Sequence, residues 1–169
     1  MKTELVTREN FSENSLDDFV RTQQVKRIYR KSESGYVLEE AEFVMDWDIE
    51  KKREAARDMM SDKTIAYTCR QDGKIVGFVS VFRELIEGYM VVDLIQVDAN
   101  NRREGFGSML FNFALYEAQR AKAKGLYISA CPSEETIRFY ISMGCEIAKQ
   151  PIRKFEEKEP DDVQMVYWL

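Results

Sequence analysis

Arg102-Arg103-Glu104-Gly105-Phe106-Gly107 is the most informative segment of the chain. It follows the apolar run Tyr89 to Val97 and precedes a segment with helical spacing of apolar residues, about Ser108 to Lys124. Glycines let the backbone turn its N–H groups toward one point, and the start of a helix adds partial positive charge there. The stretch therefore predicts a strand, an anion-binding turn and a helix in succession, and a pyrophosphate would fit the turn.

The same stretch differs from two better-known phosphate loops. No Gly-Lys-Ser or Gly-Lys-Thr follows it, as a nucleoside-triphosphate loop would require, and the third glycine of the dinucleotide-binding fingerprint is missing. A Gly-x-Gly at a helix start can also be a turn that binds nothing. Other segments of the sequence are therefore needed to distinguish an anion-binding turn from a turn that binds nothing.

The segments before this stretch predict two hairpins and two helices. A helix is expected from Ser15 to about Gln24, a hairpin from Val25 to Lys31 and Tyr36 to Phe43, a helix from Ile49 to Met60, and a hairpin from Thr64 to Arg70 and Lys74 to Phe82. The run Ile75 to Val79 and the later run Tyr89 to Val97 are almost continuously apolar, which is typical of central strands covered on both faces.

The segments after it predict a strand, a helix and two closing strands. A strand is expected from Leu126 to Ala130, a helix from Ser133 to Met143 ended by Gly144, and closing strands from Cys145 to Ala148 and Val163 to Leu169, with a solvated loop from Lys154 to Asp162. The element order favours an α/β fold with helices on both faces of its sheet.

Composition restricts the class of protein. With 169 residues and 44% hydrophobic residues, the chain is expected to fold as one domain, residues 1–169, with a substantial core. Lys and Arg total 25 against 30 Asp and Glu, a net charge of -5, so no broad basic surface for nucleic acid is expected. The amino terminus has no signal-peptide core, and no apolar run reaches the roughly 20 residues of a membrane span. Neither a nucleic-acid nor a membrane partner is expected.

The absence of histidine narrows the chemistry further. It excludes Ser-His and Cys-His pairs, imidazole bases and every metal site that needs histidine. The three cysteines show no Cys-x-x-Cys spacing, so neither a zinc knuckle nor a disulfide framework is indicated, and a reducing cytoplasm is expected. No metal is therefore expected.

Two motifs in the right order resemble the GNAT superfamily, the acyl-CoA-dependent N-acyltransferases. The family's Gln/Arg-x-x-Gly-x-Gly/Ala signature is matched by Arg102, Gly105 and Gly107. The segment from Ser133 to Cys145 resembles the family's Asn-x-x-Ala-x-x-Phe-Tyr-x-x-x-Gly-Phe, with Ser, Thr and Cys in place of the Asn, the Ala and the final Phe. The resemblance covers roughly Lys63 to Leu169 and extends, less specifically, to bacterial members whose substrate is unassigned.

This resemblance implies a fold and an activity. The fold would be a mixed, mostly antiparallel central sheet with helices on both faces. The activity would be transfer of an acetyl group from acetyl-CoA, a cosubstrate, to a primary amine of a small molecule or peptide by direct attack in a ternary complex. A noncatalytic acyl-CoA-binding or interaction module on the same scaffold is the alternative.

By the same resemblance, one set of residues would bind the cofactor. Backbone N–H groups from Arg103 to Ser108 would hold the pyrophosphate, charge would come from Arg102 and Arg103, and the strand end at Val97 would bind the pantetheine arm and the thioester carbonyl. Ser133 stands where the family has a cofactor-binding Asn. The expected cofactor-binding residues are thus Val97, Arg102, Arg103, Glu104, Gly105, Phe106, Gly107, Ser108 and Ser133. The two arginines could also be ordinary surface residues.

Two residues are candidates for proton transfer. By resemblance, Tyr140 is the general acid that protonates the leaving thiolate, and the alternative is a core tyrosine. Asp93 lies within an apolar run, where burial would raise its pKa and make it a better base, and a structural aspartate is equally compatible with the sequence. Glu84, Glu87 or a chain of water molecules could serve in its place.

The amino-terminal helix and hairpin, residues 15–43, are expected to shape the acceptor side. Aromatic residues of the hairpin stand beside carboxylates, which suits a cationic amine, and the net acidity of the chain favours the same class. These are Tyr29, Tyr36 and Phe43 with Glu33, Glu39, Glu40 and Glu42. The expected partners are acetyl-CoA and this amine, and a homodimer is compatible with the sequence.

Overall fold

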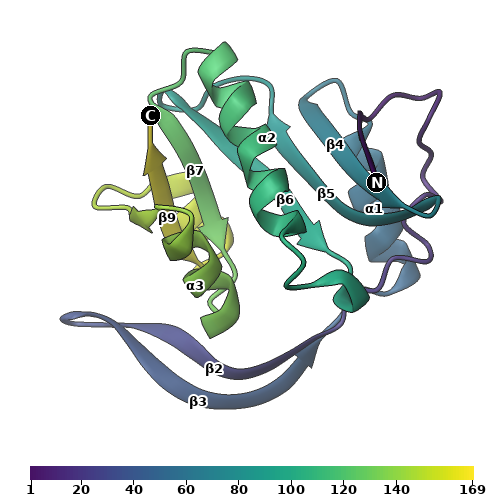
Figure 1. The fold of residues 1–169 in the computed structure, drawn as a ribbon. Helices are drawn as coiled ribbons and strands as arrows, with labels where there is room; N and C mark the ends of the chain where they lie inside the picture. Colours follow the sequence, from purple (N-terminus) through teal and green to yellow (C-terminus); the bar gives the residue numbers. More distant parts are fainter.

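A seven-stranded sheet forms the centre of the computed structural model, which describes all residues from Met1 to Leu169 (Figure 1). The strand order is β1-β4-β5-β6-β7-β9-β8, and every neighbouring pair is antiparallel except β6 and β7. The strands are β1 (Lys2–Leu5), β4 (Thr64–Gln71), β5 (Lys74–Phe82), β6 (Tyr89–Val97), β7 (Gly125–Ala130), β8 (Glu146–Ile147) and β9 (Val163–Trp168). The predicted mixed, mostly antiparallel sheet is confirmed.

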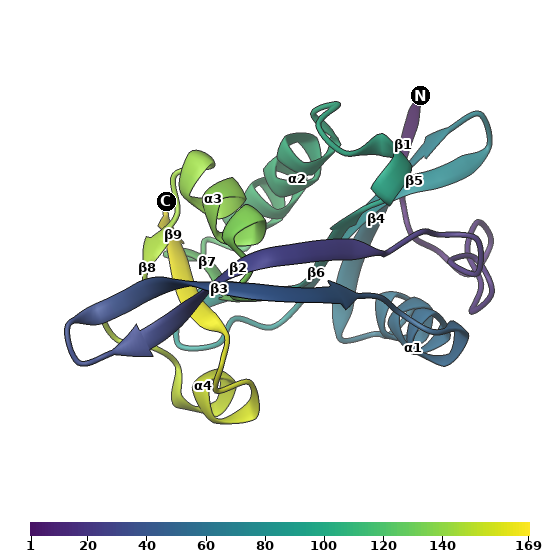
Figure 2. The same ribbon diagram turned by 90° about the horizontal axis from the view of Figure 1, so that it is seen from below.

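Helices cover both faces of this sheet (Figure 2). They are α1 (Ile49–Met59), α2 (Phe106–Arg120), α3 (Glu134–Ser142), α4 (Arg153–Lys158) and a short 3-10 helix, η1 (Ala99–Asn101). Because side chains alternate along a strand, Val79 of β5 belongs to the same buried cluster as Phe111 of α2 on one face, and Phe78 belongs to the cluster that contains Met59 of α1 on the other. The predicted burial of β5 on both sides is confirmed, since every residue from Ile75 to Val81 is buried.

The parallel pair β6 and β7 separates halfway along its length. Pairing runs only from Tyr89 to Val92 on β6, against Gly125 to Ile128 on β7. On its other side β6 has a bulge: Val92 pairs with Val81 and Leu94 with Ser80, which leaves Asp93 as the extra residue. The carboxyl ends of the two strands therefore diverge, as Figure 1 shows, and the sheet is open between them.

A separate two-stranded sheet, β2 (Gln23–Ser32) and β3 (Gly35–Met45), confirms the predicted amino-terminal hairpin. It crosses beside α3 toward the carboxyl end of β6 (Figures 1 and 2). Arg27 Nε and Nη2 donate to the carboxylate of Glu134 on α3 at 2.7 and 2.8 Å, and the N–H of Tyr29 donates to the carbonyl of Pro132 at 2.8 Å. The hairpin is thus fixed to the helix that follows β7.

The helix predicted from Ser15 to Gln24 is wrong. The chain makes turns there, with backbone bonds that each span three residues. Leu16 and Phe19 are buried against α1, which gives the helix-like spacing of apolar residues. The N–H of Val20 donates to the carboxylate of Asp98 at 2.8 Å, beyond the end of β6. That long-range bond directs the chain straight into β2, so a tertiary contact overrides the local pattern.

The loop predicted from Lys154 to Asp162 is also partly wrong, because α4 occupies its first half. The ring of Phe155 lies 5.6 Å from that of Tyr127, on the face of the sheet opposite α2, and this apolar contact holds the short helix in place. The helix predicted from Ser108 to Lys124 begins two residues earlier and ends at Arg120, before Lys122 takes a left-handed φ of 56°. None of the helices combines the length and the apolar character that crossing a bilayer requires.

Candidate active site

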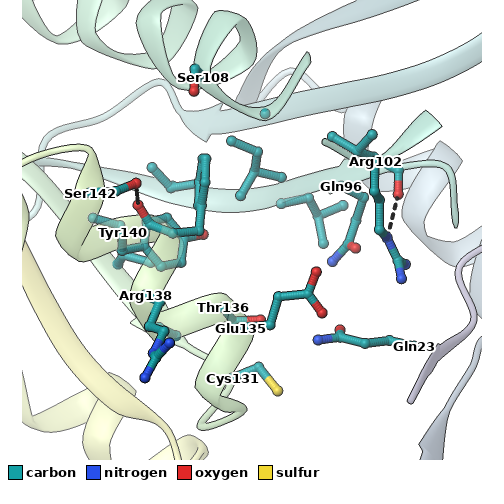
Figure 3. Close-up of a pocket in the computed structure, with 18 of the residues that line it drawn as sticks. Gln23, Gln96, Arg102, Ser108, Cys131, Glu135, Thr136, Arg138, Tyr140 and Ser142 are labelled. Carbon is teal, nitrogen blue, oxygen red and sulfur yellow. Dashed lines mark hydrogen bonds between the residues drawn. The ribbon is translucent and has the colours of Figure 1, made fainter. Parts of the chain in front are cut away.

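A cavity of about 600 Å³ lies where β6 and β7 diverge. Because the sheet is open there, residues from both of its faces line the same cavity. The α2 and α3 side contributes Arg103, Gly105, Gly107, Ser108, Arg138, Phe139, Tyr140 and Ser142, and the other lining residues include Arg21, Gln23, Asp93, Leu94, Ser129, Cys131 and Asp162. Figure 3 shows Ser108 at the start of α2, across the cavity from Gln23 and Cys131.

The turn before α2 presents unpaired donors to this cavity. No backbone N–H from Arg102 to Ser108 donates a hydrogen bond within the chain. Arg103 and Gly105 both have left-handed backbones, with φ of 64° and 87°, and Gly105 is the amino-terminal cap of α2 without any side-chain capping bond. Successive N–H groups turned in this way at a helix start are typical of anion-binding turns.

Gly107 has a different role from Gly105. A Cβ at Gly107 would lie 3.1 Å from the ring of Phe139 on α3, which is tighter than ordinary contact. A Cβ at Gly105 would meet nothing within 4 Å, so its positive φ is what favours glycine there. One glycine therefore lets α2 approach α3, and the other shapes the turn.

The two arginines of the motif are used differently. Arg102 Nε donates to the carbonyl of Val97 at 3.4 Å and its Nη2 to the carbonyl of Arg21 at 3.1 Å, so its guanidinium holds backbone together (Figure 3). Arg103 is exposed at the cavity and has no ion-pair partner. Arg138 of α3 is a further cation on this side, which the sequence analysis missed, although it lies inside the second motif.

The edge of β6 also offers backbone groups to the cavity. The N–H of Asp98 donates to the carbonyl of Val76, on β5's side of the strand. Because backbone groups alternate in direction along a strand, those of Val97 and Ile95 point away from β5, toward the open side where β7 has diverged. Both residues line the cavity.

Tyr140 lies at the cavity wall, on α3. Its ring packs against Phe139 and Phe111, with centroids 5.2 and 6.3 Å away, and its hydroxyl has no hydrogen-bond partner in the chain. Burial raises the pKa of this hydroxyl well above the ordinary tyrosine value, with nearby thiols and Asp162 acting in the same direction. Tyr140 is therefore protonated at neutral pH, which is the form a general acid needs.

Asp93 lies at the bulge of β6 and lines the same cavity. Burial raises the pKa of its carboxyl, the hydrogen bond from Ser80 Oγ at 3.2 Å lowers it, and the negative charge of Asp58 on α1 raises it again. Ser80 lies two residues after Phe78, which packs in the α1 cluster, and alternate residues of a strand share a face, so the bond from Ser80 places Asp93 on the face of the sheet opposite α2. A carboxylate with a raised pKa is a better proton acceptor than an exposed one.

Asp162 is a second half-buried carboxylate in the cavity, and the sequence analysis missed it. It directly precedes β9, and its Oδ2 accepts a hydrogen bond from Ser129 Oγ of β7 at 3.0 Å. Burial raises the pKa of Asp162, and the bond from Ser129 lowers it. Asp162 is the last residue of a charged run for which the sequence predicts a solvated loop. Its position directly before a closing strand is the one sequence feature that could have identified it.

Several expected site residues lie outside the cavity lining. Ser133 is 2% exposed and caps α3: its Oγ accepts from Gln23 Nε2 at 3.1 Å and from the N–H of Thr136 at 3.3 Å. The lining therefore gives no support to a cofactor contact by Ser133.

Six other expected residues also lie outside the cavity lining. They are the exposed Glu104, the core residue Phe106, Glu84 and Glu87 before β6, and Tyr36 and Glu40 of the hairpin. The amino-terminal region reaches the cavity through Arg21 and Gln23 at the base of the hairpin, which no sequence pattern marks.

Comparisons with known proteins agree with this geometry. Residues 62–146 match the family model described as "Acetyltransferase (GNAT) domain". Comparison with curated protein sequences gave no match.

Two solved structures match over almost the whole chain, and others match over about two thirds of it. Nourseothricin acetyltransferase superposes with a TM-score of 0.74 at 15% identity, covering 99% of this chain and 97% of that one. A protein described as a streptothricin acetyltransferase of Bacillus anthracis, in complex with acetyl coenzyme A, superposes with a TM-score of 0.70 at 18% identity, covering 100% and 98%. The aminoglycoside 6'-N-acetyltransferase of Enterococcus faecium gives 0.54 at 16% identity, covering 69% and 79%. At these identities the likeness shows a shared fold.

Proposed function

Because the chain belongs to the GNAT acetyltransferase family, we propose that it transfers an acetyl group from acetyl-CoA to a primary amine of a small molecule or peptide. One observation carries the proposal. A single cavity through the open sheet joins a turn of unpaired N–H groups on one side to half-buried carboxylates on the other. Donor and acceptor could therefore meet in one ternary complex.

The α2 side would hold the donor. The unpaired N–H groups from Arg102 to Ser108 fit a pyrophosphate, and Arg103, which has no ion-pair partner, adds positive charge in the same turn. Arg138 lines the same cavity but is paired with Glu134 at 2.8 Å. The backbone groups of Ile95 and Val97 would pair with the pantetheine arm along the open edge of β6. Acetyl-CoA supplies the acetyl group as a thioester when it is bound, and CoA thiol is the product that leaves.

The carboxylate side would prepare the acceptor. A primary amine is protonated at neutral pH, and it has to lose a proton before it can attack a carbonyl carbon. Asp93 is positioned to accept that proton, since its raised pKa keeps its basicity closer to that of the amine. Asp162, hydrogen-bonded to Ser129, is the second carboxylate available in the same cavity.

Tyr140 would complete the proton transfers from the donor side. Its hydroxyl keeps its proton at neutral pH and has no partner in the chain, so it is free to donate to the departing sulfur. The two proton-transfer groups thus approach the reacting centre from opposite faces of the sheet. Such an arrangement requires neither histidine nor a covalent acyl-enzyme.

The test combines binding and turnover. Calorimetry with CoA should detect binding at micromolar-scale affinity, and a thiol-release assay with acetyl-CoA and a panel of amines should detect turnover. Binding without thiol release above the rate of hydrolysis, for every amine, would leave the noncatalytic module as the better description. No binding of CoA would overturn the proposal altogether.

A further inference from the structure

The buried guanidinium of Arg21 lacks a hydrogen-bond partner for one of its donors. The residue is 5% exposed and lines the cavity, and its Nε is the only side-chain nitrogen or oxygen that is fully shielded from solvent and has no hydrogen-bond partner. Nη1 donates to Gln23 Oε1 at 3.3 Å, and the guanidinium lies over the ring of Trp47 at 5.7 Å. Neither contact neutralises its charge.

No carboxylate of the chain pairs with Arg21. Its guanidinium takes part in none of the ion pairs within 4.0 Å. The carboxylate of Asp46 influences it from a distance, but its two oxygens accept from Thr22 Oγ1 at 3.0 Å and from the N–H of Trp47 at 2.8 Å. Burial lowers the pKa of Arg21, because a desolvated cation lacks the interactions that water would supply. Because this buried cation has free donors at a cavity and no carboxylate of the chain pairs with it, we expect it to bind an anion from outside the chain.

The position of Arg21 argues against the phosphates of CoA as that anion. Trp47, beneath its guanidinium, packs against Phe78 on the α1 face of the sheet, with the rings 6.3 Å apart, and Leu94 borders the same cluster. The turn of unpaired N–H groups lies at the start of α2, on the opposite face. Arg21 therefore shares its face of the sheet with Asp93.

We propose that Arg21 binds a carboxylate of the acceptor, so that the amine substrate is a zwitterion such as an amino acid or a peptide with a free carboxyl group. This inference rests on the proposed acetyl transfer. Nε and the neighbouring Nη2 of a guanidinium form a planar fork that matches the two oxygens of a carboxylate. The carboxylates of Asp93 and Asp162 lie in the same cavity and suit the ammonium end of such a molecule.

Gln23 would be a positioning residue for this contact. It is 8% exposed, its Oε1 accepts from Arg21 Nη1, and its Nε2 donates to the buried Ser133 Oγ at 3.1 Å. The bond to Ser133 fixes the amide orientation, which leaves Oε1 to hold one arm of the guanidinium. A zwitterionic acceptor also differs from the purely cationic one that the net charge of the chain favours, because net charge says nothing about the charges inside one cavity.

The first experiment compares matched acceptors. Each amino acid in a panel is assayed beside its own carboxamide, which keeps the amine and removes the negative charge. The wild type should acetylate the acid with a kcat/KM about 10- to 100-fold above the amide, the usual effect of a charge-assisted hydrogen bond. Arg21→Met should abolish that preference and leave the KM for acetyl-CoA unchanged. Arg8→Met, which removes an exposed arginine outside the cavity, should keep the preference.

A binding experiment separates this inference from the proposed acetyl transfer. In the presence of CoA, an N-acetyl amino acid should raise the melting temperature of the wild type more than its amide does, and Arg21→Met should lose the difference. Without ligand, Arg21→Met should melt no lower than the wild type, because it removes a buried unpaired charge; Arg21→Gln gives the same comparison if the Met variant folds poorly.

Each outcome decides between the two proposals. Equal rates on acids and amides in an active wild type would overturn the carboxylate site and leave acetyl transfer standing. Weaker binding of CoA to Arg21→Met would also overturn it, since Arg21 would then serve the donor. If no amine is acetylated but acids still stabilise the protein through Arg21, acetyl transfer fails and the anion site stands.

Discussion

Tyr140→Phe isolates the proposed general acid, because it removes one oxygen atom and nothing else. The ring contacts with Phe111 and Phe139 persist in the variant. The hydroxyl makes no hydrogen bond in the chain, so its loss leaves no partner unpaired. Because a buried hydroxyl without a partner costs free energy, we expect the variant to melt no lower than the wild type.

Turnover should respond very differently. A positioned general acid contributes roughly 10²- to 10⁴-fold, so kcat should fall by about 10²-fold or more. Because the hydroxyl acts on the leaving sulfur and not on the bound cofactor, the dissociation constant of CoA should stay the same and kcat/KM should fall with kcat. Thiol release measures the rates, and calorimetry measures the binding of CoA.

Tyr67→Phe is a matched control outside the cavity. The hydroxyl of Tyr67 donates to Glu117, which is 3% exposed, so its loss leaves a buried carboxylate with fewer partners. This variant should lose about 1 to 3 kcal/mol of stability and keep its turnover at temperatures where it is folded. Tyr140→Phe should therefore lose turnover and keep its stability, whereas Tyr67→Phe should lose stability and keep its turnover. Unchanged turnover in Tyr140→Phe would make Tyr140 a packing residue and refute the assignment of the acid.

Three other substitutions test the site and the fold. Gly105→Ala places a side chain at a φ of 87°, which costs roughly 1 to 2 kcal/mol. The free turn can relax to avoid this strain, whereas pyrophosphate binding requires the left-handed backbone, so calorimetry should find CoA binding about 10-fold weaker; undiminished binding would contradict the role of the turn. Asp93→Asn should abolish the rise of kcat/KM with pH. Since burial raises the pKa of Asp93, the stability that its neutral form provides is lost as pH rises through that pKa, and the Asn variant should melt no lower than the wild type at neutral pH. Gly125→Ala would put a Cβ 2.2 Å from the carbonyl oxygen of Tyr167, so it should destabilise the protein by several kcal/mol, on the order of 3, in thermal melts; an unchanged melting temperature would contradict the register of β7 and β9.

Features that depend on neighbouring residues were predicted from the sequence. The turn from Arg102 to Gly107, the helix that follows it and the hairpin at Asp72 and Gly73 all formed as expected. Glycine conformation, helix spacing and strand alternation act within a few residues, so a linear pattern records them. The apolar run of β5 likewise indicated a strand buried on both faces, whereas β6 is buried only from Tyr89 to Val92.

The first helix and the loop after Lys154 were wrong for one shared reason. The bond from Val20 to Asp98 joins residues 78 positions apart, and the contact of Phe155 with Tyr127 joins two different elements. The pattern of residues within either segment gives no information about the distant residue that it contacts. Local preference is weak enough for one such contact to reverse it.

The carboxylate side of the cavity was decided by the tertiary structure. The sequence singled out Asp93 for its apolar surroundings, but Arg21 and Asp162 lie in segments whose patterns indicate a helix and a solvated loop. They line one cavity with Asp93 because β6 and β7 diverge beyond Val92. The segment before β2 brings Arg21 to this opening, and the segment before β9 brings Asp162 to it. The motif around Gly105 is local and can be recognised in the sequence, whereas a site assembled from three distant segments exists only once the order of the strands has brought them together.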